Sequence, residues 1–346
     1  MVKYNSLRKY NNHKGEWIMK QQKRKMQVSL SILLAAVMLI GMCAVLPVTA
    51  AGAKTSGDYE YENINDGTVR ITGYTGTDDI ITIPSEIDGK KVSRIGIGAF
   101  WGCTSLTSVK IPETVTGLEV SAFSGCTSLA GIDIPNSVTS IEMNAFGNCT
   151  SLTSIKIPES VVSIGSEAFR DCRKLTGIKI PKKVTKIASA AFVSCVSLTD
   201  VEIPQGVTSI GGSAFYDCSN LTKVTIPRSV ETIGYHAFGY KNMIPNDGFQ
   251  YGKIDNFTIC GYKGTPAQAY ANDNGFLFIA EVVLGDADLD GEIKVADVLL
   301  MQKVIAKIIQ PSEEQIEAGD IDHDGTITVK DVLSVQKYLA KVIPNL

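Results

Sequence analysis

Apolar residues in the middle of the chain recur at a fixed interval of 23 residues. Each unit opens with an alanine and a phenylalanine, seven times from Ala99 to Phe238, and the later apolar positions keep the same spacing. The unit reads A-F-x-x-C-x-x-L-x-x-I-x-I-P-x-x-V-x-x-I, with valine or leucine replacing some isoleucines. A repeat of this length predicts a solenoid, because each unit can bury its apolar face only against its neighbours.

The second half of each unit alternates between inward and outward positions. Val109 and Ile111 in the first unit flank one polar residue, which predicts a short strand with these two side chains turned inward. Pro112 follows at once and cannot donate a backbone hydrogen bond, so the strand should end there. The A-F-x-x-C segment places its phenylalanine and cysteine on one side of a helical or 3₁₀ turn.

The repeat becomes irregular at both ends, where caps with a polar outer face are expected. Residues 59–95 echo the strand and its proline but insert extra turn residues. After Phe238 a loop rich in glycine, asparagine and tyrosine precedes two expected strands, at 256–260 and 276–280. Between these strands Thr265, Pro266 and Gly275 predict a short helix, with a capping residue, a proline at its first position and a glycine beyond its end.

Six cysteines occupy one position of the repeat, from Cys103 to Cys218. An even number of cysteines in a secreted chain is typical of disulfides. Equivalent side chains in a solenoid, however, point in the same direction rather than toward one another. We therefore expect buried free thiols that pack as small apolar groups, with disulfides as the alternative.

Residues 1–52 combine a basic segment, an apolar run at about 28–46 and a string of small residues. This order is typical of a cleaved secretory signal peptide, although the apolar run could also nearly span a bilayer as an uncleaved anchor. Eight of the 33 basic and one of the 36 acidic residues lie there, so the rest of the chain has a net charge of about −10. Nothing in it resembles a nucleic-acid-binding surface, and no membrane contact is expected after cleavage.

Two acidic segments near the C-terminus repeat each other 34 residues apart. Each has aspartates at positions 1, 3, 5 and 12 of a loop, a glycine at position 6 and an isoleucine at position 8. Calcium takes about six to eight hard oxygen ligands, and this spacing wraps carboxylates around one ion while position 7 offers its backbone carbonyl. The candidate ligands are Asp286, Asp288, Asp290, Glu292 and Asp297 in the first loop and Asp320, Asp322, Asp324, Thr326, Thr328 and Asp331 in the second.

The two loops differ at position 9. Lys294 cannot ligate a cation, whereas Thr328 could do so directly or through water. Two solvated acidic turns are the alternative to a pair of calcium sites. Because the clustered carboxylates would repel without a metal, folding of residues 285–343 should require two calcium ions. A helix is expected after each loop, at 298–309 and 332–342, and a capping box beginning at Ser312 predicts a short helix between them.

The 23-residue unit resembles the BspA-like leucine-rich repeats over roughly residues 60–280. This resemblance implies a β-rich solenoid in a secreted or surface protein that binds other proteins or surfaces. It implies no catalysis.

The twin loop–helix (F-hand) motifs, with aspartate at position 12, resemble a type I dockerin over residues 285–343. The resemblance implies a small all-α domain that docks onto a cohesin of a scaffolding protein, as in cellulosomes. It places the contacts on Val295, Ala296, Gln302, Lys303 and Lys307 in one half and on Val329, Lys330, Gln336, Lys337 and Lys341 in the other. Their recurrence suggests two near-equivalent faces, with solvated helix surfaces as the alternative. Neither half has the Ser-Thr pair common at positions 10 and 11, which leaves the cohesin class open.

No base, nucleophile and orienting residue fall together in the sequence, since His13, His236 and His323 are isolated. We therefore expect a secreted, non-catalytic binding protein with a signal peptide at 1–52, a solenoid at 53–280 and a dockerin at 281–346. Outward threonines such as Thr107 and Thr153 could form a polar ladder for a partner. A carbohydrate-binding module of a polysaccharide-degrading complex is the alternative, against which the candidate aromatic residues look scattered: Trp101, Tyr216, Tyr235 and Tyr240. An undetected hydrolase is a third, weaker reading.

Overall fold

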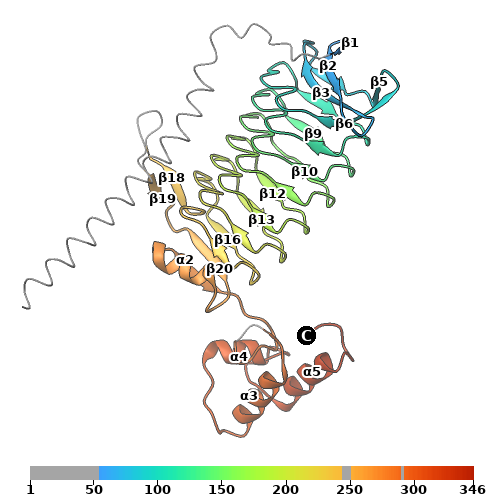
Figure 1. The fold of residues 1–346 in the computed structure, drawn as a ribbon. Helices are drawn as coiled ribbons and strands as arrows, with labels where there is room; N and C mark the ends of the chain where they lie inside the picture. The colour runs from blue at the N-terminus through green and yellow to red at the C-terminus, as the bar shows by residue number, and fades with distance from the viewer. Residues whose placement is uncertain (1–53, 244–250, 290–291) are drawn as a thin grey trace, which may run out of the picture. The chain divides into compact units, whose positions relative to one another are not determined.

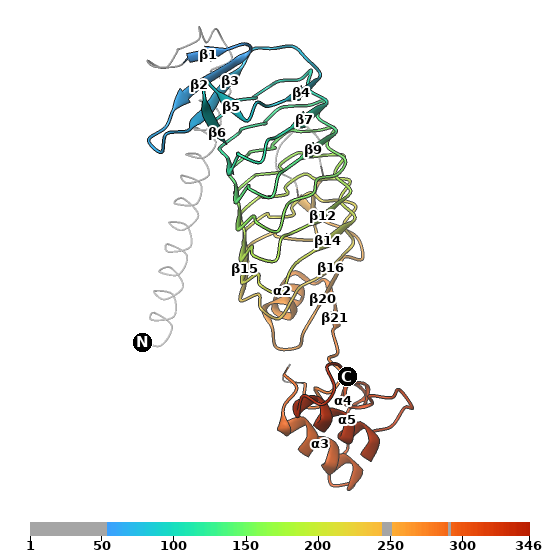
Figure 2. The ribbon, with the colours of Figure 1, turned by 90° about the vertical axis from the view of Figure 1, so that its right-hand side faces the viewer.

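The computed structural model describes residues 54–243, 251–289 and 292–346. Each 23-residue unit forms one coil, and successive coils stack side by side, as Figures 1 and 2 show. Each coil contributes one short strand to a long parallel ladder. Paired residues in this ladder are 23 residues apart in sequence, as Ile141 and Ile164 are. Its strands in the repeat are β6 (Lys90–Ile95), β8 (Gly117–Leu118), β10 (Ser140–Ile141), β11 (Ser163–Ile164), β13 (Lys186–Ile187), β15 (Ser209–Ile210) and β17 (Thr232–Ile233).

The strand expected from the I-x-I alternation forms a second ladder. Val109 and Ile111 are buried as predicted, and the strand β7 ends at Lys110, two residues before Pro112. An isolated bridge from Asp133 to Lys156 continues the ladder from its first three strands to the next coil. The strands are β4 (Ile80–Thr82), β7 (Ser108–Lys110) and β9 (Gly131–Asp133), then β12 (Gly177–Lys179) with β14 (Asp200–Glu202), then β16 (Lys223–Thr225) with β20 (Thr258–Gly261) and β21 (Leu277–Ala280).

The phenylalanines of the repeat form a continuous stack between the two ladders. All seven are at most 1% exposed, and successive ring centroids lie 4.8 to 5.6 Å apart with interplanar angles of 1° to 11°. The A-F-x-x-C segment is a single 3₁₀-type turn rather than a helix, closed by hydrogen bonds such as that from the Cys103 amide to the Phe100 carbonyl. It ends after one turn because the residue before each cysteine adopts a left-handed conformation, as Gly125 and Asp171 do.

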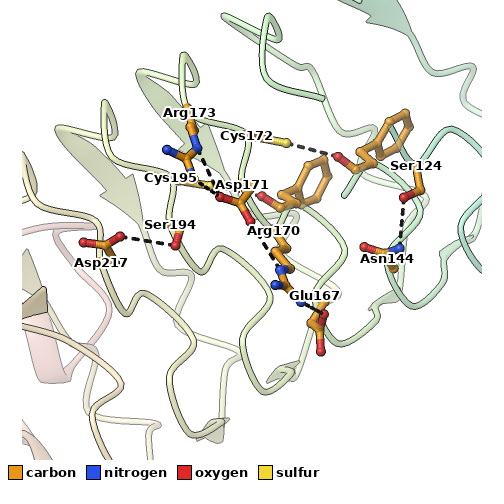
Figure 3. Close-up of polar contacts among 12 residues, drawn as sticks. Ser124, Asn144, Glu167, Arg170, Asp171, Cys172, Arg173, Ser194, Cys195 and Asp217 are labelled. Atoms are coloured by element: carbon orange, nitrogen blue, oxygen red, sulfur yellow. Dashed lines mark hydrogen bonds and ion pairs between the residues drawn. The ribbon is translucent and has the colours of Figure 1, made fainter. Parts of the chain in front are cut away.

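The prediction of free thiols is confirmed. All seven cysteines among the described residues are unpaired. The Cys172 thiol donates to the carbonyl oxygen of Phe146 in the preceding coil at 3.2 Å (Figure 3), and four other repeat cysteines do the same. Burial raises the pKa of the Cys149 thiol to about 12, so this thiol stays protonated at neutral pH.

The expected threonine ladder exists but has a different role. The Thr153 hydroxyl donates to the Ala130 carbonyl, and that of Thr176 to the Thr153 carbonyl, at 3.3 and 3.4 Å. Thr199 continues the series at 3.1 Å. The hydroxyl protons therefore satisfy backbone carbonyls of the neighbouring coil instead of being offered to a partner.

An antiparallel ribbon closes the N-terminal end of the solenoid. The ribbon consists of β1 (Lys54–Ser56), β2 (Tyr59–Asn63) and β3 (Val69–Tyr74), and β5 (Glu86–Ile87) pairs antiparallel with β6. The ring of Tyr74 packs against that of Phe100, the first phenylalanine of the stack, with centroids 5.4 Å apart and the planes tilted by 34°. The irregular residues 59–95 thus extend the ladder and cover its end.

The opposite end of the solenoid is closed by a hairpin, a helix and a strand. The hairpin is β18 (Tyr240–Asn242) with β19 (Tyr251–Lys253), the helix is α2 (Pro266–Asn274), and the strand is β21. As predicted, Pro266 opens the helix and Gly275 lies beyond its end at φ 62°. The Thr265 hydroxyl bonds to the Tyr262 carbonyl, however, rather than capping a helix amide. Tyr270 on α2 covers Phe238, the last ring of the stack.

The C-terminal part is all-helical, with a small core of its own. Its helices are α3 (Val295–Ile305), α4 (Glu313–Gly319) and α5 (Val329–Leu339). The capping box at Ser312 and Gln315 is confirmed. The expected starts of the other two helices, 298 and 332, are three residues late and their expected ends too late. The reason is that Asp297 and Asp331 lie inside the first helical turn, where each accepts a hydrogen bond from the capping residue's amide.

In the described part of the chain, no helix is both long and apolar enough to cross a membrane. The expected signal peptide at residues 1–52 lies outside the described residues, as does position 43 among the cysteines.

Candidate metal-binding loops and exposed helix faces

The first acidic loop brings three of its predicted ligands together. Oxygen atoms of Asp286, Asp288 and Asp297 all lie within 4.8 Å of one another. Asp286 and Asp297 are 2% and 0% exposed, which is unusual for carboxylates and costly without a compensating partner. The Asp297 carboxylate accepts hydrogen bonds from the amides of Asp288 at 3.0 Å and Lys294 at 2.7 Å. Asp290, the predicted ligand at position 5, lies outside the described residues.

The second loop gathers Asp320, Asp322 and Asp324 within the same distance of one another. The Asp320 carboxylate accepts hydrogen bonds from the amides of Asp324 at 3.0 Å and Gly325 at 2.6 Å, so the loop closes around position 1. Gly325 has φ 92°, which is the glycine-favouring conformation that the sequence pattern requires at position 6.

Asp331 at position 12 of the second loop is fully buried. Its carboxylate accepts hydrogen bonds from the Thr328 amide and hydroxyl, both at 2.8 Å, and from the Ile321 amide at 2.8 Å. Burial opposes ionisation, but the hydrogen bonds from Thr328 and from the loop amides outweigh it and lower the pKa of Asp331. The hydrogen bonds of the folded loop therefore stabilise the ionised form of Asp331.

These donors fit a hard divalent cation. Both loops offer carboxylate oxygens at short mutual distance, which is the chemistry that calcium prefers. At position 7 the Glu292 carboxylate forms an ion pair with Lys294 at 2.5 Å, and the Thr326 hydroxyl donates to Asp324 at 2.8 Å. The side chains at position 7 are thus engaged by protein groups, and the sequence pattern assigns the backbone carbonyl of this position to the cation. At position 9 the Thr328 hydroxyl is engaged by Asp331.

All ten predicted docking residues are exposed on or near α3 and α5. Each of these helices also exposes a pair of large apolar side chains, which is unusual on a helix surface. On α3 Val295 is 74% and Leu299 is 50% exposed, and on α5 Val329 is 70% and Leu333 is 47% exposed. The sequence analysis missed Leu299 and Leu333 because a leucine in an amphipathic helix normally faces the core. Leu299 and Leu333 occupy equivalent positions in the two halves, 34 residues apart, and this repetition could have indicated a shared role.

Buried positions on α3 and α5 follow the same repeat. Val298 and Met301 on α3 pack with Val332 and Val335 on α5, and these residues are also 34 apart in sequence. Lys307 and Lys341, beyond the helix ends, both adopt the left-handed conformation. The two halves thus present one set of side chains twice.

The comparisons with known proteins agree with these features. The sequence family described as "BspA type Leucine rich repeat region" matches in six copies at residues 79–195 and 139–257, and the "Dockerin type I domain" matches residues 284–340. No curated protein matches the chain.

Solved structures of bacterial leucine-rich repeat proteins are similar to the solenoid. A leucine-rich cell surface protein of Faecalibacterium prausnitzii is 30% identical with a TM-score of 0.51, over 67% of this chain and 73% of that one. The T. pallidum leucine-rich repeat protein TpLRR is 33% identical with a TM-score of 0.48, over 52% of this chain and 85% of that one. The chain therefore belongs to the BspA-type leucine-rich repeat family and carries a type I dockerin domain at its C-terminus.

Proposed function

We propose that this protein is a secreted, non-catalytic binding protein that attaches through its dockerin to a cohesin of a scaffolding protein, while its solenoid recognises a protein or a surface. Leucine-rich repeats and dockerins are interaction modules, and no enzyme domain was found among the family matches. The observation that carries the proposal is the twofold repetition of an acidic loop followed by a helix with an exposed apolar and basic face.

Calcium binding is the first part of the proposal. The ligands would be the carboxylates at positions 1, 3, 5 and 12 of each loop and the carbonyls of Glu292 and Thr326. A bound calcium ion supplies positive charge that offsets the repulsion among these carboxylates. Asp297 and Asp331 join each loop to its helix, because their carboxylates also accept hydrogen bonds in the first helical turn. Closure of the loop would therefore fix the start of the helix that carries the docking residues.

Two equivalent docking faces are the second part. Face A consists of Val295, Ala296, Leu299, Gln302, Lys303 and Lys307, and face B consists of Val329, Lys330, Leu333, Gln336, Lys337 and Lys341. Exposed apolar side chains surrounded by lysines suit a partner surface with an apolar centre and acidic groups around it. Because face B repeats face A, a cohesin that accepts one should accept the other after a rotation of about 180°.

The experiment is a titration of the full chain with a panel of purified cohesins by isothermal calorimetry. We expect a 1:1 complex with at least one cohesin in calcium and none after a chelator is added. Leu299→Asp should disable face A and Leu333→Asp face B, and each single variant should keep binding within about threefold of the unchanged protein. The double variant should lose at least about a hundredfold, since an aspartate on each face places an unpaired charge in the contact.

Glu317→Arg, on the exposed surface of α4, is the matched control, since it changes charge outside both faces. Absence of any calcium-dependent partner would contradict the docking proposal. Loss of all binding in one single variant would contradict the equivalence of the faces while leaving docking intact.

Secretion is the third part. Cleavage of the signal peptide would leave a mature chain that begins near residue 53, with the solenoid to about 280 and the dockerin from about 281. Mass spectrometry of the protein from the culture medium measures the mature N-terminus, and a cell-retained chain that keeps residues 1–52 would contradict cleavage.

A further inference from the structure

Five aromatic rings meet at the C-terminal end of the solenoid. His236 lies at the centre of this aromatic cluster, with its ring centroid 3.6 Å from that of Tyr235, 3.9 Å from Tyr240, 4.4 Å from Tyr251 and 6.2 Å from Tyr216. The coil that opens at Ala214 contributes three of these rings, and the strands β18 and β19, which are labelled in Figure 1, contribute Tyr240 and Tyr251. In the sequence these tyrosines look scattered, but the fold brings them together.

The base of the aromatic cluster is fixed and its top is open. His236 and Tyr240 are 6% and 7% exposed, and the Tyr240 hydroxyl donates to the side-chain oxygen of Asn274 on α2 at 2.7 Å. Tyr235 and Tyr251, in contrast, are 69% and 54% exposed. Two rings are thus presented to solvent on a buried support.

Closing the end of the solenoid does not require the two exposed rings. Tyr270 covers the last ring of the stack, Phe238, with a ring-centroid distance of 6.4 Å, and its hydroxyl donates to the Phe238 carbonyl at 2.8 Å. Phe276 packs behind it against Phe257 at 5.3 Å. Since these residues already seal the core, the outer faces of Tyr235 and Tyr251 are a surface available to a ligand.

The surroundings of the two rings are polar. Asn242 pairs with Tyr251 across the hairpin, so their side chains share one side of it. Gly252 faces the other way, and the side chain of Met243 lies against it. The Asp217 carboxylate lies next to the hairpin, where it accepts a hydrogen bond from the Asn242 amide at 3.0 Å. Aromatic faces beside a carboxylate and a carboxamide are groups that can hold a ligand with both C–H and O–H surfaces.

A sugar ring has this combination of surfaces. The C–H groups of a pyranose form an apolar face that stacks on an aromatic ring, and its hydroxyls bond to carboxylates and amides at the edge. A quaternary ammonium ion fits less well, because it needs ring faces that converge on an open centre, and His236 fills the centre here. We propose that the aromatic cluster binds a neutral polysaccharide by stacking pyranose rings on Tyr235 and Tyr251.

This site goes beyond cohesin docking and assigns a ligand class to the solenoid. It uses no residue of the C-terminal loops. A protein that holds both activities would bring a scaffold and a polysaccharide together without any catalytic centre of its own.

The test is isothermal calorimetry of the calcium-loaded full chain with three neutral hexasaccharides, built of β-1,4-linked glucose, xylose or mannose. We expect at least one of them to bind. Tyr235→Ala and Tyr251→Ala should each weaken that binding about tenfold or more, whereas Tyr235→Phe should stay within about threefold because it keeps the ring. Trp101→Ala is the matched control, since Trp101 is a similarly exposed ring, at 63%, in the first coil.

Three results would overturn the proposal: no hexasaccharide binds, Trp101→Ala weakens binding as much as Tyr235→Ala, or choline chloride displaces the sugar. Thermal unfolding of each variant at the temperature of the unchanged protein shows that a loss of affinity does not come from a loss of fold. Cohesin affinity, measured on the same samples, separates a failure of this site from a failure of docking.

Discussion

Two neighbouring alanines in the solenoid should respond in opposite directions to the same substitution. Ala190 has φ +56°, in the left-handed region, and occupies a position where every described coil has a positive φ. Ala191, the next residue, is fully buried beside the phenylalanine stack. Ala190→Gly should therefore raise the free energy of unfolding, and Ala191→Gly should lower it.

The magnitudes follow from two effects. A left-handed conformation costs an L-residue roughly 1–2 kcal/mol, which Ala190→Gly removes, while glycine adds about 0.5–1 kcal/mol of backbone entropy in the unfolded chain. The net gain should be about 0.5–1 kcal/mol. Ala191→Gly meets the same entropy cost and also loses a buried methyl group worth about 0.8 kcal/mol, which gives a loss of about 1.5 kcal/mol.

Urea unfolding in constant calcium, followed by circular dichroism, measures both changes. A difference of about 2 kcal/mol separates the two midpoints by roughly 1 M urea if the slope is about 2 kcal/mol per molar. Ser213→Gly repeats the Ala190 test in the following coil, at φ +58°, and should also stabilise. Destabilisation by both Ala190→Gly and Ser213→Gly would refute the reasoning, because the left-handed backbone would then carry no cost.

Four further predictions concern the core, the thiols and the metal. Phe169→Ala should lower the free energy of unfolding by about 3–5 kcal/mol in urea, because the buried ring stacks at 5.5 and 5.3 Å on both neighbours; a loss under about 1 kcal/mol would contradict a continuous stack. Iodoacetamide should leave Cys172 unlabelled in the native protein and label it in denatured, unreduced protein, and mass spectrometry would expose a disulfide as a failure to label. Above about pH 9 the Cys149 thiol ionises in the unfolded chain but stays protonated in the folded protein to about pH 12, so the free energy of unfolding falls as the pH rises. Cys149→Ala should reduce the slope of the free energy of unfolding against pH by about 1.4 kcal/mol per pH unit, measured by urea titrations at several pH values. An unchanged slope would contradict the raised pKa. Adding a chelator should remove the calorimetric transition of the dockerin and leave that of the solenoid, and an unchanged scan would count against metal-dependent folding.

The alternation of apolar and polar residues predicted the strand of the second ladder, but nothing in the sequence predicted the strand of the long ladder. Val109 and Ile111 flank a single outward residue, so their inward orientation follows from the period of a strand. The strand at Gly117–Leu118 has only two residues and no alternation to detect. It forms because stacking places each coil in register with the next, and a single unit carries no trace of that register.

The left-handed positions were missed for a chemical reason. Glycine marks such positions when it occupies them, as at Gly98, but the equivalent residues in later coils include Glu167 and Ala190, which do not favour positive φ. The surrounding coil imposes the conformation on them. Tertiary packing therefore overrides a local preference here, and only the structure reveals it.

The candidate sites divide in the same way. The aspartates of the two loops could be predicted because the ligand spacing is continuous in sequence. Leu299 and Leu333 could not be assigned to the surface, since which side of α3 and α5 is buried depends on how the two helices pack. Tyr251 joins Tyr235 only through the pairing of β18 with β19, outside the regular repeat.

The two cores differ in size, which is why we expect the dockerin to depend on a metal and the solenoid not to. The solenoid buries a continuous series of apolar residues that runs from its N-terminal ribbon to α2, so each coil is stabilised by its neighbours. Among its described residues, the dockerin has a core cluster of six buried side chains, of which four are an alanine and three valines, with partly buried apolar residues packed against it. So small a core resembles that of other short domains that depend on disulfides or metals for stability. Buried aspartates weaken a fold when they are unpaired, so we expect a bound calcium ion to make these same residues stabilising.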